Sequence, residues 1–421
     1  MPTIFAEATP PGRGGVSIIR ISGPQARAAA EGISGPLPQP RHGYFRVLRD
    51  AGEDVDQALV MRFDAGASFT GEEVVEFHLH GAPVIVRRVK DALRQHGLRE
   101  AEAGEFTRRA FLSGRMDLAE VEGLGDLLAA ETEAQRRQAM HAMSRALQQK
   151  VADWRAQLVE AGALIAVSLD FADEEVPDEV DDQVHVLLRG VCAEITAILA
   201  DFPATERLRE GFEVALIGPV NAGKSSLLNR LAQRDLAITS DIAGTTRDVI
   251  ELKADILGLP VTFLDTAGLR QSEDAIEAVG IDRAEQRARA ADLRLHLSGD
   301  GAVIDELWRD GDIAVRNKAD LGGAGGDIAI SCKNGRNVAQ LLALVHDRLV
   351  TRLPKSGLVA HERQADALQQ ALKALDVDSR MVPEILADRL TLANKALEKL
   401  LGRIDVDDYL GFIFSQFCIG K

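Results

Sequence analysis

The residues of this chain that are best suited to chemistry fall in four short motifs. In chain order these are Gly218-Pro-Val-Asn-Ala-Gly-Lys-Ser225, Gly244-Thr-Thr246, Asp265-Thr-Ala-Gly268 and Asn317-Lys-Ala-Asp320. The first fits the pattern G-x-x-x-x-G-K-[ST], in which backbone N–H groups surround phosphate oxygens. Lys224 is expected to reach the β- and γ-phosphates, and the Ser225 hydroxyl to bind Mg²⁺. This motif predicts a nucleoside triphosphate site.

The second and third motifs supply groups that respond to a γ-phosphate. Thr246 is the expected second protein ligand of Mg²⁺, from a loop that becomes ordered only when a γ-phosphate is present. Asp265 follows the apolar strand predicted at Val261–Leu264 and is expected to hold Mg²⁺ through water. The Gly268 N–H would sense the γ-phosphate. Either motif alone would indicate only a turn or a helix cap.

The fourth motif selects the base. Guanine presents two neighbouring donors, N1–H and the C2 amino group, which the Asp320 carboxylate can accept together. Adenine has an acceptor at N1 and no amino group at C2, so Asp320 would be unpaired against it in a buried site. Ser331-Cys-Lys333 fits a final base-contacting loop, where the backbone N–H matters more than the side chain. The expected nucleotide is GTP rather than ATP.

The complete predicted GTP site takes in these motifs and the loops beside them. Its residues are Asn221, Ala222, Gly223, Lys224, Ser225, Ser226, Ser240, Asp241, Ile242, Ala243, Gly244, Thr245, Thr246, Asp265, Thr266, Ala267, Gly268, Asn317, Lys318, Ala319, Asp320, Ser331, Cys332 and Lys333. Many small GTPases place a water-orienting glutamine after the third motif, but Leu269 stands there. Glu277 is the candidate in its place, and the alternative is an ordinary acidic residue on a solvated helix face.

Hydrophobic periodicity predicts the elements that position these residues. The apolar strand Phe212–Ile217 runs directly into the phosphate loop, and a helix is predicted over Ser226–Leu231. Strands are predicted at Val16–Ile21 and Val74–Leu79. From about residue 117 the spacing becomes helical, and one face is predicted to hold Leu118, Val121, Leu124, Leu127 and Leu128.

The chain is predicted to be a multidomain protein of α/β and all-α parts. An α/β domain is expected over residues 1–116, and a Ras-like P-loop domain over 211–352 is inserted into a helical domain formed by 117–210 and 353–421. One strand of the inserted domain departs from expectation. Arg294 and His296 interrupt a central parallel strand that should be almost continuously apolar. GTP binding is expected to survive, and either the domain stability or the dimer surface is expected to be atypical.

Composition limits the other classes of function. The net charge of −16 argues against broad, nonspecific nucleic-acid binding. No apolar run is long enough to span a bilayer, and the start lacks a signal-peptide layout, so a cytoplasmic location without a membrane partner is expected. The acidic run from Asp170 to Asp182 is predicted to be a solvated loop, with a docking site for a basic partner as the alternative. His78 and His80 share a strand face, but two histidines without a third ligand predict no metal site.

Three further segments match one family when they are taken with the nucleotide motifs. They are Thr9-Pro-Pro-Gly-Arg-Gly-Gly15 with Arg20-Ile-Ser-Gly23, Ser68-Phe-Thr-Gly-Glu72, and Phe417-Cys-Ile-Gly-Lys421. Over essentially its full length the chain closely resembles the MnmE (TrmE) family of bacterial tRNA modification GTPases. The resemblance implies an N-terminal tetrahydrofolate-binding, aminomethyltransferase-like domain that forms a homodimer, and a helical domain that carries the GTPase domain.

The resemblance also implies a reaction and its partners. With the FAD-containing protein MnmG (GidA), in a heterotetramer-type complex, the family adds an aminomethyl or carboxymethylaminomethyl group to C5 of the wobble uridine of certain tRNAs. The one-carbon donor is a tetrahydrofolate derivative, in the 5-formyl or 5,10-methylene form, and FAD is on the partner. The implied folate-binding positions are Arg20, Glu76, Arg115 and Lys421, with Arg115 where lysine is usual.

The resemblance further implies that K⁺-dependent dimerisation of the GTPase domains activates hydrolysis. K⁺ takes the place of an arginine finger, and its ligands map to Asn221, Ser240, Ile242 and Thr245. Glu277 matches the family's catalytic glutamate. Because Val220 replaces proline and Ser240 replaces threonine, we expect potassium dependence to persist with a changed affinity.

Two other functions stay open. One is a regulatory GTPase switch that recruits RNA or ribosomal partners without modification chemistry. The other is a free-standing folate aminomethyltransferase whose GTPase domain is regulatory. Reduced-folate binding that is lost on removal of Lys421 would favour the modification enzyme, whereas tight RNA binding without folate affinity would favour the switch.

Overall fold

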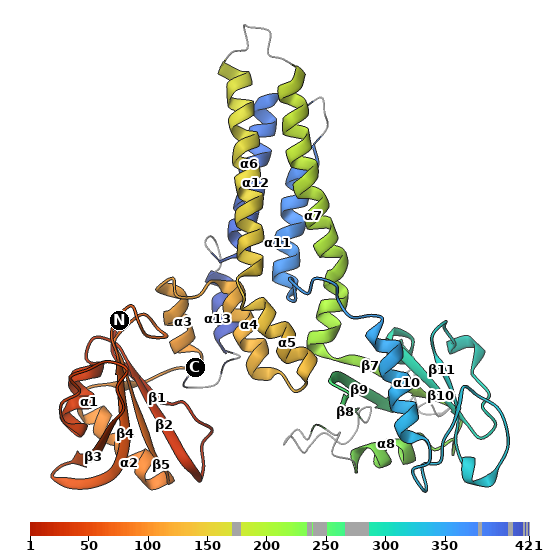
Figure 1. Cartoon of the computed structure of the whole chain (residues 1–421), viewed down its shortest axis with the longest axis horizontal. Coiled ribbons are helices and arrows are strands. Elements are labelled where there is room, and N and C mark those ends of the chain that lie inside the picture. The colour runs from red at the N-terminus through yellow and green to blue at the C-terminus, as the bar shows by residue number, and fades with distance from the viewer. Residues whose placement is uncertain are drawn as a thin grey trace, which may run out of the picture. The chain divides into compact units, whose positions relative to one another are not determined.

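The computed structural model describes residues 1–170, 178–233, 238, 251–265, 286–377, 381–402, 407–415, 417 and 420. It divides into two compact units, Met1–Gly125 with Asn394–Lys421, and Asp126–Ala393. The first unit is built on a mixed sheet, and the second holds long helices and a mostly parallel sheet (Figure 1). The predicted fold class is confirmed, and the four-part domain division remains a prediction.

The first unit is organised around a six-stranded sheet in the order β3-β4-β5-β2-β1-β6. The strands are β1 Ile4–Glu7, β2 Gly14–Ser22, β3 Tyr44–Asp50, β4 Glu53–Phe63, β5 Val74–Gly81 and β6 Arg99–Glu100. Neighbouring strands are antiparallel except β1 and β6, which are parallel. The two strands predicted in this region are confirmed within β2 and β5.

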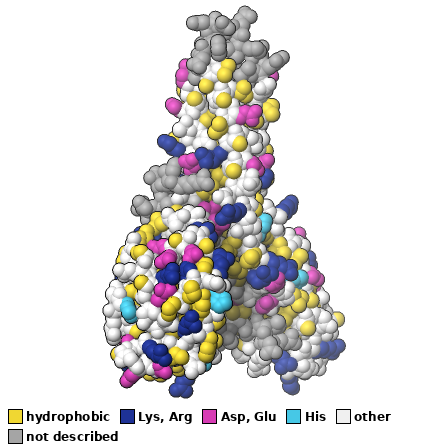
Figure 2. Space-filling model, turned by 60° about the vertical axis from the view of Figure 1, so that its left-hand side comes forward, with side chains coloured by type: hydrophobic (Ala, Val, Ile, Leu, Met, Phe, Trp, Pro, Cys, Tyr) yellow, Lys and Arg dark blue, Asp and Glu magenta, His cyan; other side chains and the backbone are white. Residues whose placement is uncertain are grey.

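The two faces of this sheet differ because side chains alternate along each strand. On one face, Ile19, Ile21 and Phe77 pack in a core with two helices, α1 Ala26–Ser34 and α2 Pro83–Gln95. Pro83 suits the first turn of α2, where its missing N–H would have no helical partner. The alternate positions leave Phe45 67% exposed and place Arg20 on the opposite face. Figure 2 shows hydrophobic side chains among basic and histidine ones on the surface of this unit.

The first unit also contains three helices beyond the sheet, α3 Glu105–Leu112, the start of α4 Leu118–Ala129, and α13 Asp407–Ser415. Leu118 and Val121 of α4 pack against Phe414 and Phe417. The predicted helix face is wrong at Leu128, which is 45% exposed. The reason is that the buried residues of α4 lie only in its first half, up to Gly123.

The second unit contains a helical segment in which α7 packs against α6 and α11 (Figure 1). Its helices are α5 Glu133–Ala142, α6 Ala146–Asp170, α7 Asp178–Glu210, α11 Glu362–Leu375 and α12 Pro383–Leu400. Thr132 begins α5 with a capping box to Gln135. The acidic run is not wholly a loop, because Asp170 ends α6 and Asp178 starts α7. None of the helices in the described ranges is both long enough and apolar enough to cross a membrane.

A second six-stranded sheet has the order β12-β11-β10-β7-β9-β8 and is parallel except for β8 with β9. Its strands are β7 Phe212–Ile217, β8 Glu251–Ile256, β9 Leu259–Asp265, β10 Leu293–Ser298, β11 Ile313–Arg316 and β12 Ile328–Ala329, and its helices include α8 Lys224–Ala232 and α10 Val338–Val350. The phosphate loop, Asp265 and Asn317 come after β7, at the end of β9 and after β11. Because these strands are parallel, the three lie at the same edge of the sheet.

The two polar residues in β10 are accommodated by a buried ion pair. Arg294 Nε donates to Asp312 Oδ2 at 2.7 Å, and the side chains are 2% and 1% exposed. The Arg294 N–H donates to Asp312 Oδ1 at 3.2 Å, and Arg294 Nη1 donates to the Ala291 carbonyl at 3.1 Å. The His296 ring lies 5.1 Å from the Trp308 ring. The strand remains intact because the turn before β11 supplies the carboxylate that Arg294 needs.

Asp201 on α7 holds the segment that leads into α11. Its Oδ1 accepts a hydrogen bond from the Lys355 N–H at 2.8 Å, and its Oδ2 accepts from the N–H groups of Ser356 at 2.6 Å and Gly357 at 3.1 Å. Burial raises the pKa of Asp201, but these backbone donors outweigh burial and lower it overall. The carboxylate is therefore charged at neutral pH and fixes residues 355–357 in the segment that leads into α11.

Replacing Asp201 by alanine is expected to lower the free energy of unfolding by about 2 kcal/mol, because three backbone donors lose their acceptor. Hydrogen exchange at residues 355–357 measures the loss as a lower free energy of local opening. Asp366→Ala removes an exposed aspartate from α11 and serves as the control. Equal exchange at 355–357 in Asp201→Ala and the parent protein would contradict this role.

Candidate functional site

The phosphate loop depends on two glycines that allow close backbone packing. Gly218 has φ +156° and Gly223 has φ +99°, a region that other residues rarely adopt. A Cβ at Gly218 would collide with the Leu297 carbonyl oxygen, and one at Gly223 with the Asn317 side-chain amide. The loop therefore packs directly against β10 and against the base-binding motif.

Lys224 and Ser225 lie where the phosphate-loop motif predicts. Lys224 Nζ donates to the Gly218 carbonyl at 2.6 Å and to the Pro219 carbonyl at 3.2 Å, so the ammonium lies over the loop. Burial lowers the pKa of Lys224, and the Asp265 carboxylate partly offsets this effect. A phosphate oxygen would be a stronger acceptor than these neutral carbonyls because it is charged.

The two predicted magnesium-site groups of the phosphate loop and β9 meet directly. Ser225 Oγ donates to Asp265 Oδ2 at 3.0 Å. Asp265 is 3% exposed as the last residue of β9. A hydroxyl and a carboxylate are oxygen ligands of the kind that Mg²⁺ prefers. The sheet thus brings together two residues that are 40 positions apart.

The base-binding motif is tied to the phosphate loop by Asn317. Its Nδ2 donates to the Ala222 carbonyl at 2.9 Å, and its Oδ1 accepts from the N–H groups of Lys318 at 2.8 Å and Cys332 at 3.3 Å. Lys318 has φ +59°, a left-handed conformation that turns the chain between the two base-binding positions. Asn317 therefore joins three separate loops of the nucleotide site.

Asp320 is held as an ionised acceptor at the mouth of the site. Ser331 Oγ donates to Asp320 Oδ1 at 2.7 Å. This hydrogen bond, with a smaller effect of Lys333, lowers the pKa of Asp320. A carboxylate at this position can accept from N1–H and the C2 amino group of guanine. Burial raises the pKa of the neighbouring Cys332 thiol, which keeps that side chain neutral.

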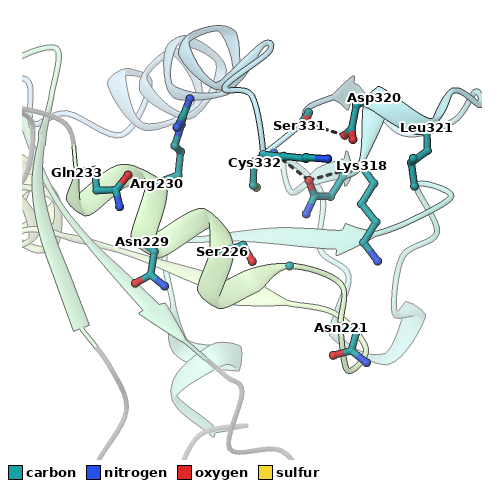
Figure 3. Close-up of a pocket in the computed structure, with 13 residues that line it drawn as sticks. Asn221, Ser226, Asn229, Arg230, Gln233, Lys318, Asp320, Leu321, Ser331 and Cys332 are labelled. Atoms are coloured by element: carbon teal, nitrogen blue, oxygen red, sulfur yellow. Dashed lines mark hydrogen bonds between the residues drawn. The ribbon is translucent and has the colours of Figure 1, made fainter.

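Asn221 and Gly223 of the phosphate loop line a pocket of about 760 Å³ together with the base-binding loops, as Figure 3 shows. Lys224, Ser225 and Asp265 are not among its lining residues. Sequence reasoning missed four of its lining residues, Asn229, Arg230, Gln233 and Leu321. Asn229 and Arg230 share one face of α8 with Ser226, and Gln233, directly after the helix, continues the same helical spacing. This helical spacing from Ser226 is the sequence signal that could have identified them. The pocket is lined by residues of the phosphate loop, of the Asn317–Asp320 motif and of the Ser331–Lys333 loop, which were predicted to bind one ligand.

Part of the predicted site lies outside the described residues. This part comprises Ser240, Asp241, Ile242, Ala243, Gly244, Thr245, Thr246, Thr266, Ala267, Gly268, Glu277 and Lys421. Their assignments remain predictions. Asn221, the remaining predicted K⁺ ligand, is exposed on the phosphate loop with φ +63°.

A second candidate site lies on the first unit, at the face of the sheet opposite α1 and α2. Arg20 on β2 and Glu76 on β5 are directly paired in register, and Arg20 Nε donates to Glu76 Oε1 at 2.9 Å. Their side chains are 23% and 16% exposed, so the pair is open to a ligand. Arg115 is exposed and donates from Nη1 to the Gly66 carbonyl at 3.1 Å. The structure thus joins two predicted folate residues and gives Arg115 a different contact.

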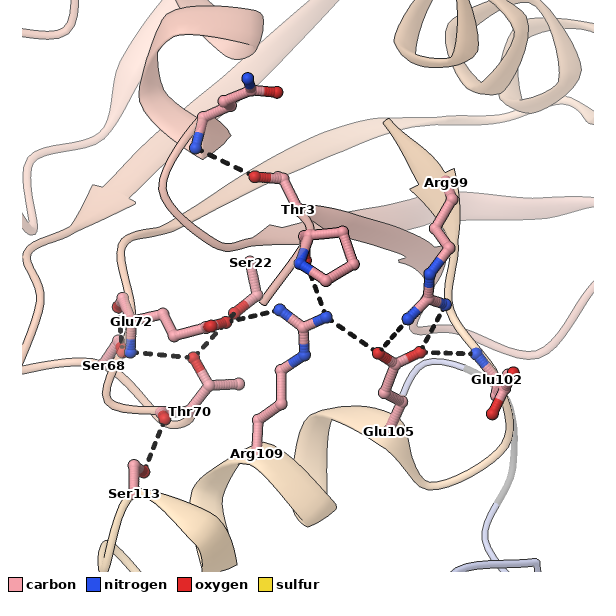
Figure 4. Close-up of polar contacts among 12 residues, drawn as sticks. Thr3, Ser22, Ser68, Thr70, Glu72, Arg99, Glu102, Glu105, Arg109 and Ser113 are labelled. Carbon is pink, nitrogen blue, oxygen red and sulfur yellow. Dashed lines mark hydrogen bonds and ion pairs between the residues drawn. The ribbon is translucent and has the colours of Figure 1, made fainter. Parts of the chain in front are cut away.

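The Ser68–Glu72 segment is explained by a buried network around Arg109 (Figure 4). Arg109 is 3% exposed and donates to Glu72 Oε2, to the Pro2 carbonyl and to Glu105 Oε1, each at 2.8 Å. Burial raises the pKa of Glu105, but donors from Arg99 and Arg109 outweigh it and bring it to about 2. Sequence reasoning missed Arg109, because its partners lie far away in the chain.

Fold and site together define the class of protein. A phosphate loop after a central strand, a Ser225–Asp265 contact and an Asn317–Asp320 base site define a P-loop GTPase domain within a larger chain. The family description "MnmE helical domain" matches residues 118–418, and "GTP-binding protein TrmE N-terminus" matches residues 3–115.

Relatives along the whole chain carry one name. The tRNA modification GTPase MnmE of Paracoccus denitrificans is 59% identical over 421 residues, and that of Roseobacter denitrificans is 52% identical over 430 residues, each with 100% of both chains covered. The chain belongs to the MnmE family of tRNA modification GTPases. Among solved structures, a variant of Era from Aquifex aeolicus bound to GDP·AlF4⁻ is 26% identical over 38% of this chain and 66% of that chain, with a TM-score of 0.25. Agreement at that level carries no weight here.

Proposed function

We propose that this chain hydrolyses GTP and couples hydrolysis to the modification of the wobble uridine of tRNA. The observation that carries the proposal is the joined site in which Asn317 links the phosphate loop to the base loops and Ser331 holds Asp320. The names of the full-length relatives supply the class of reaction. The uridine chemistry is assigned to the complex with an FAD protein of the MnmG (GidA) type.

The residues present fit Mg²⁺, because the Ser225 hydroxyl and the Asp265 carboxylate already meet at 3.0 Å. Ser225 and Thr246 would hold the ion, and Asp265 would act through water. The ion neutralises charge on the β- and γ-phosphates. Lys224 adds a second positive charge at the same phosphates, and the backbone N–H groups of the loop orient them for attack by water.

For hydrolysis itself we propose that Glu277 positions the attacking water and that the GTPase domains act as a K⁺-dependent homodimer. Asn221, Ser240, Ile242 and Thr245 would hold K⁺, which neutralises charge developing between the β- and γ-phosphates. The support within the described residues is Asn221, which projects from the phosphate loop. A side-chain carbonyl there has the oxygen chemistry that a monovalent cation requires.

A tetrahydrofolate derivative, in the 5-formyl or 5,10-methylene form, is the proposed one-carbon donor. The Arg20–Glu76 pair fits such a ligand, since a carboxylate can accept from the N–H groups of a pterin and a guanidinium can donate to its carbonyl. Arg115 and Lys421 would add positive charge for the glutamate tail. The donor supplies the carbon unit, and this chain's residues bind and orient it.

Asp320→Asn tests the GTP assignment. An amide donates where guanine also donates, so the affinity for GDP should fall roughly 30-fold, about 2 kcal/mol, while xanthosine diphosphate should bind better than to the parent protein. Fluorescent-nucleotide titration measures both. Asp310→Asn, on an exposed turn, is the control and should bind GDP like the parent. Unchanged preference for GDP in Asp320→Asn would overturn the base assignment.

A further inference from the structure

The loop between β4 and β5 presents an aromatic ring at the Arg20–Glu76 pair. Phe69 is 38% exposed, although its neighbours Ser68 and Thr70 are only 4% and 0% exposed. The centre of its ring lies 5.8 Å from the guanidinium carbon of Arg20. A partly exposed ring therefore lies near the guanidinium that is paired with the Glu76 carboxylate.

The loop that carries this ring is fixed from two sides, by β2 and by α3. From β2, Ser22 Oγ donates to Glu72 Oε2 at 2.7 Å and lies 2.8 Å from Thr70 Oγ1. From α3, Arg109 donates to Glu72, and Ser113 Oγ, which follows this helix, donates to the Thr70 carbonyl at 2.7 Å. Figure 4 shows these contacts converging on Thr70 and Glu72, which follow Phe69 in the chain.

The turn of the loop adds to this rigidity. The Gly66 N–H donates to the Gly71 carbonyl at 2.9 Å and closes the loop on itself. Gly71 has φ +80°, and a Cβ there would come within 2.8 Å of Ser113 Oγ. The position of Phe69 is thus set before any ligand binds, which reduces the entropy that binding must overcome.

Single exposed apolar side chains are common on protein surfaces. This one differs because a buried polar network holds it next to two groups that can hydrogen-bond the edge of a ring. Ligand sites combine such an apolar wall with a few convergent polar groups. We propose that Phe69 is a ligand-binding residue of this site and stacks on the flat pyrimidine part of a reduced pterin. The proposal rests on the folate donor of the proposed function.

Isothermal titration calorimetry of the full chain with 5-formyltetrahydrofolate tests the stacking role. Phe69→Leu should weaken binding about tenfold, because aliphatic contact replaces ring stacking. Phe69→Tyr should bind like the parent, because the ring is kept. Phe45→Leu removes a 67%-exposed ring from β3 of the same unit and is the matched control, with no change expected. Thermal unfolding of each variant verifies that the unit is folded.

Two fragments separate the parts of the ligand. Each fragment is tested as a competitor of 5-formyltetrahydrofolate. In Phe69→Leu the affinity for 6-methyltetrahydropterin should fall, and the affinity for p-aminobenzoylglutamate should be the same as in the parent. The reverse pattern overturns the pterin assignment. Equal affinity of Phe69→Leu and the parent for the whole ligand overturns the role of Phe69, while the folate function stands. A parent protein that does not bind the ligand overturns the folate donor and this inference with it.

Discussion

Glu277→Ala is expected to lower steady-state GTP hydrolysis in K⁺ by roughly a hundredfold or more and to leave GDP affinity unchanged. The reason is that Leu269 cannot hydrogen-bond water, so the proposed mechanism depends on the Glu277 carboxylate to position it. The motifs that bind the nucleotide do not include Glu277. Phosphate release at saturating GTP measures the rate, and fluorescent-GDP titration measures the affinity.

The same assay in K⁺ and in Na⁺ at matched ionic strength tests the activation mechanism. The parent protein should be strongly stimulated by K⁺, and Glu277→Ala should remove most of that stimulation. Glu273→Ala changes a carboxylate four positions earlier and is the control. Equal rates of the parent in both salts would show that the Asn221 loop does not build a cation site, and the dimer-activated mechanism would be abandoned while the GTP assignment stood.

Arg294→Met is expected to destabilise the sheet of the second unit by about 3–5 kcal/mol. The substitution leaves Asp312 buried, 1% exposed, without its guanidinium partner at 2.7 Å. It also removes the donor to the Ala291 carbonyl. Removing one partner of a buried pair costs far more than removing a surface charge, because the remaining charge cannot reach water.

Hydrogen exchange of peptides from β10 and β11 measures this loss of stability within the sheet. A global unfolding curve is unsuitable because the unfolding of a chain with several domains is not two-state. Arg309→Met is the control, because Arg309 is exposed and contacts Asp312 through its backbone: its N–H donates to Asp312 Oδ2 at 2.8 Å and its carbonyl accepts from the Asp312 N–H at 3.1 Å. If Arg294→Met changed the opening free energy no more than Arg309→Met does, the pair would have no such role.

The pair also gives this stability a pH dependence. Burial raises the pKa of Asp312, but the His296 ring, whose Nε2 lies 3.5 Å from Asp312 Oδ2, and Arg294 outweigh burial. They hold the pKa at about 2, below the value of about 3.9 in an unfolded chain. The stabilisation of the sheet by the ionised Asp312 is therefore complete above about pH 4 and is lost as the pH falls toward 2. The difference between parent and Arg294→Met should be smaller at pH 3 than at pH 7.

The nucleotide site was largely predictable because each of its motifs is contiguous. The glycines, Lys224 and Ser225, predicted to bind phosphate, lie in one turn of chain, and Asp320, predicted to bind the base, lies in one short loop. The strand that ends at Asp265 could be recognised from its apolar run. Hydrophobic periodicity was less reliable for predicting which side chains are buried. Leu128 falls on the apolar helical spacing but is 45% exposed.

By itself the sequence determined the class of nucleotide site and predicted the residues for its metal ion, since these depend on residues that are neighbours in the chain. Only the tertiary structure decided which side chains contact one another across the chain. Asp312 pairs with Arg294 because β10 and β11 lie side by side, and Arg109 reaches Glu72 and the Pro2 carbonyl because α3 packs near the strand ends. It also decided that Phe69 faces solvent beside Arg20. Such contacts depend on strand order and packing between distant segments, which local pattern does not encode.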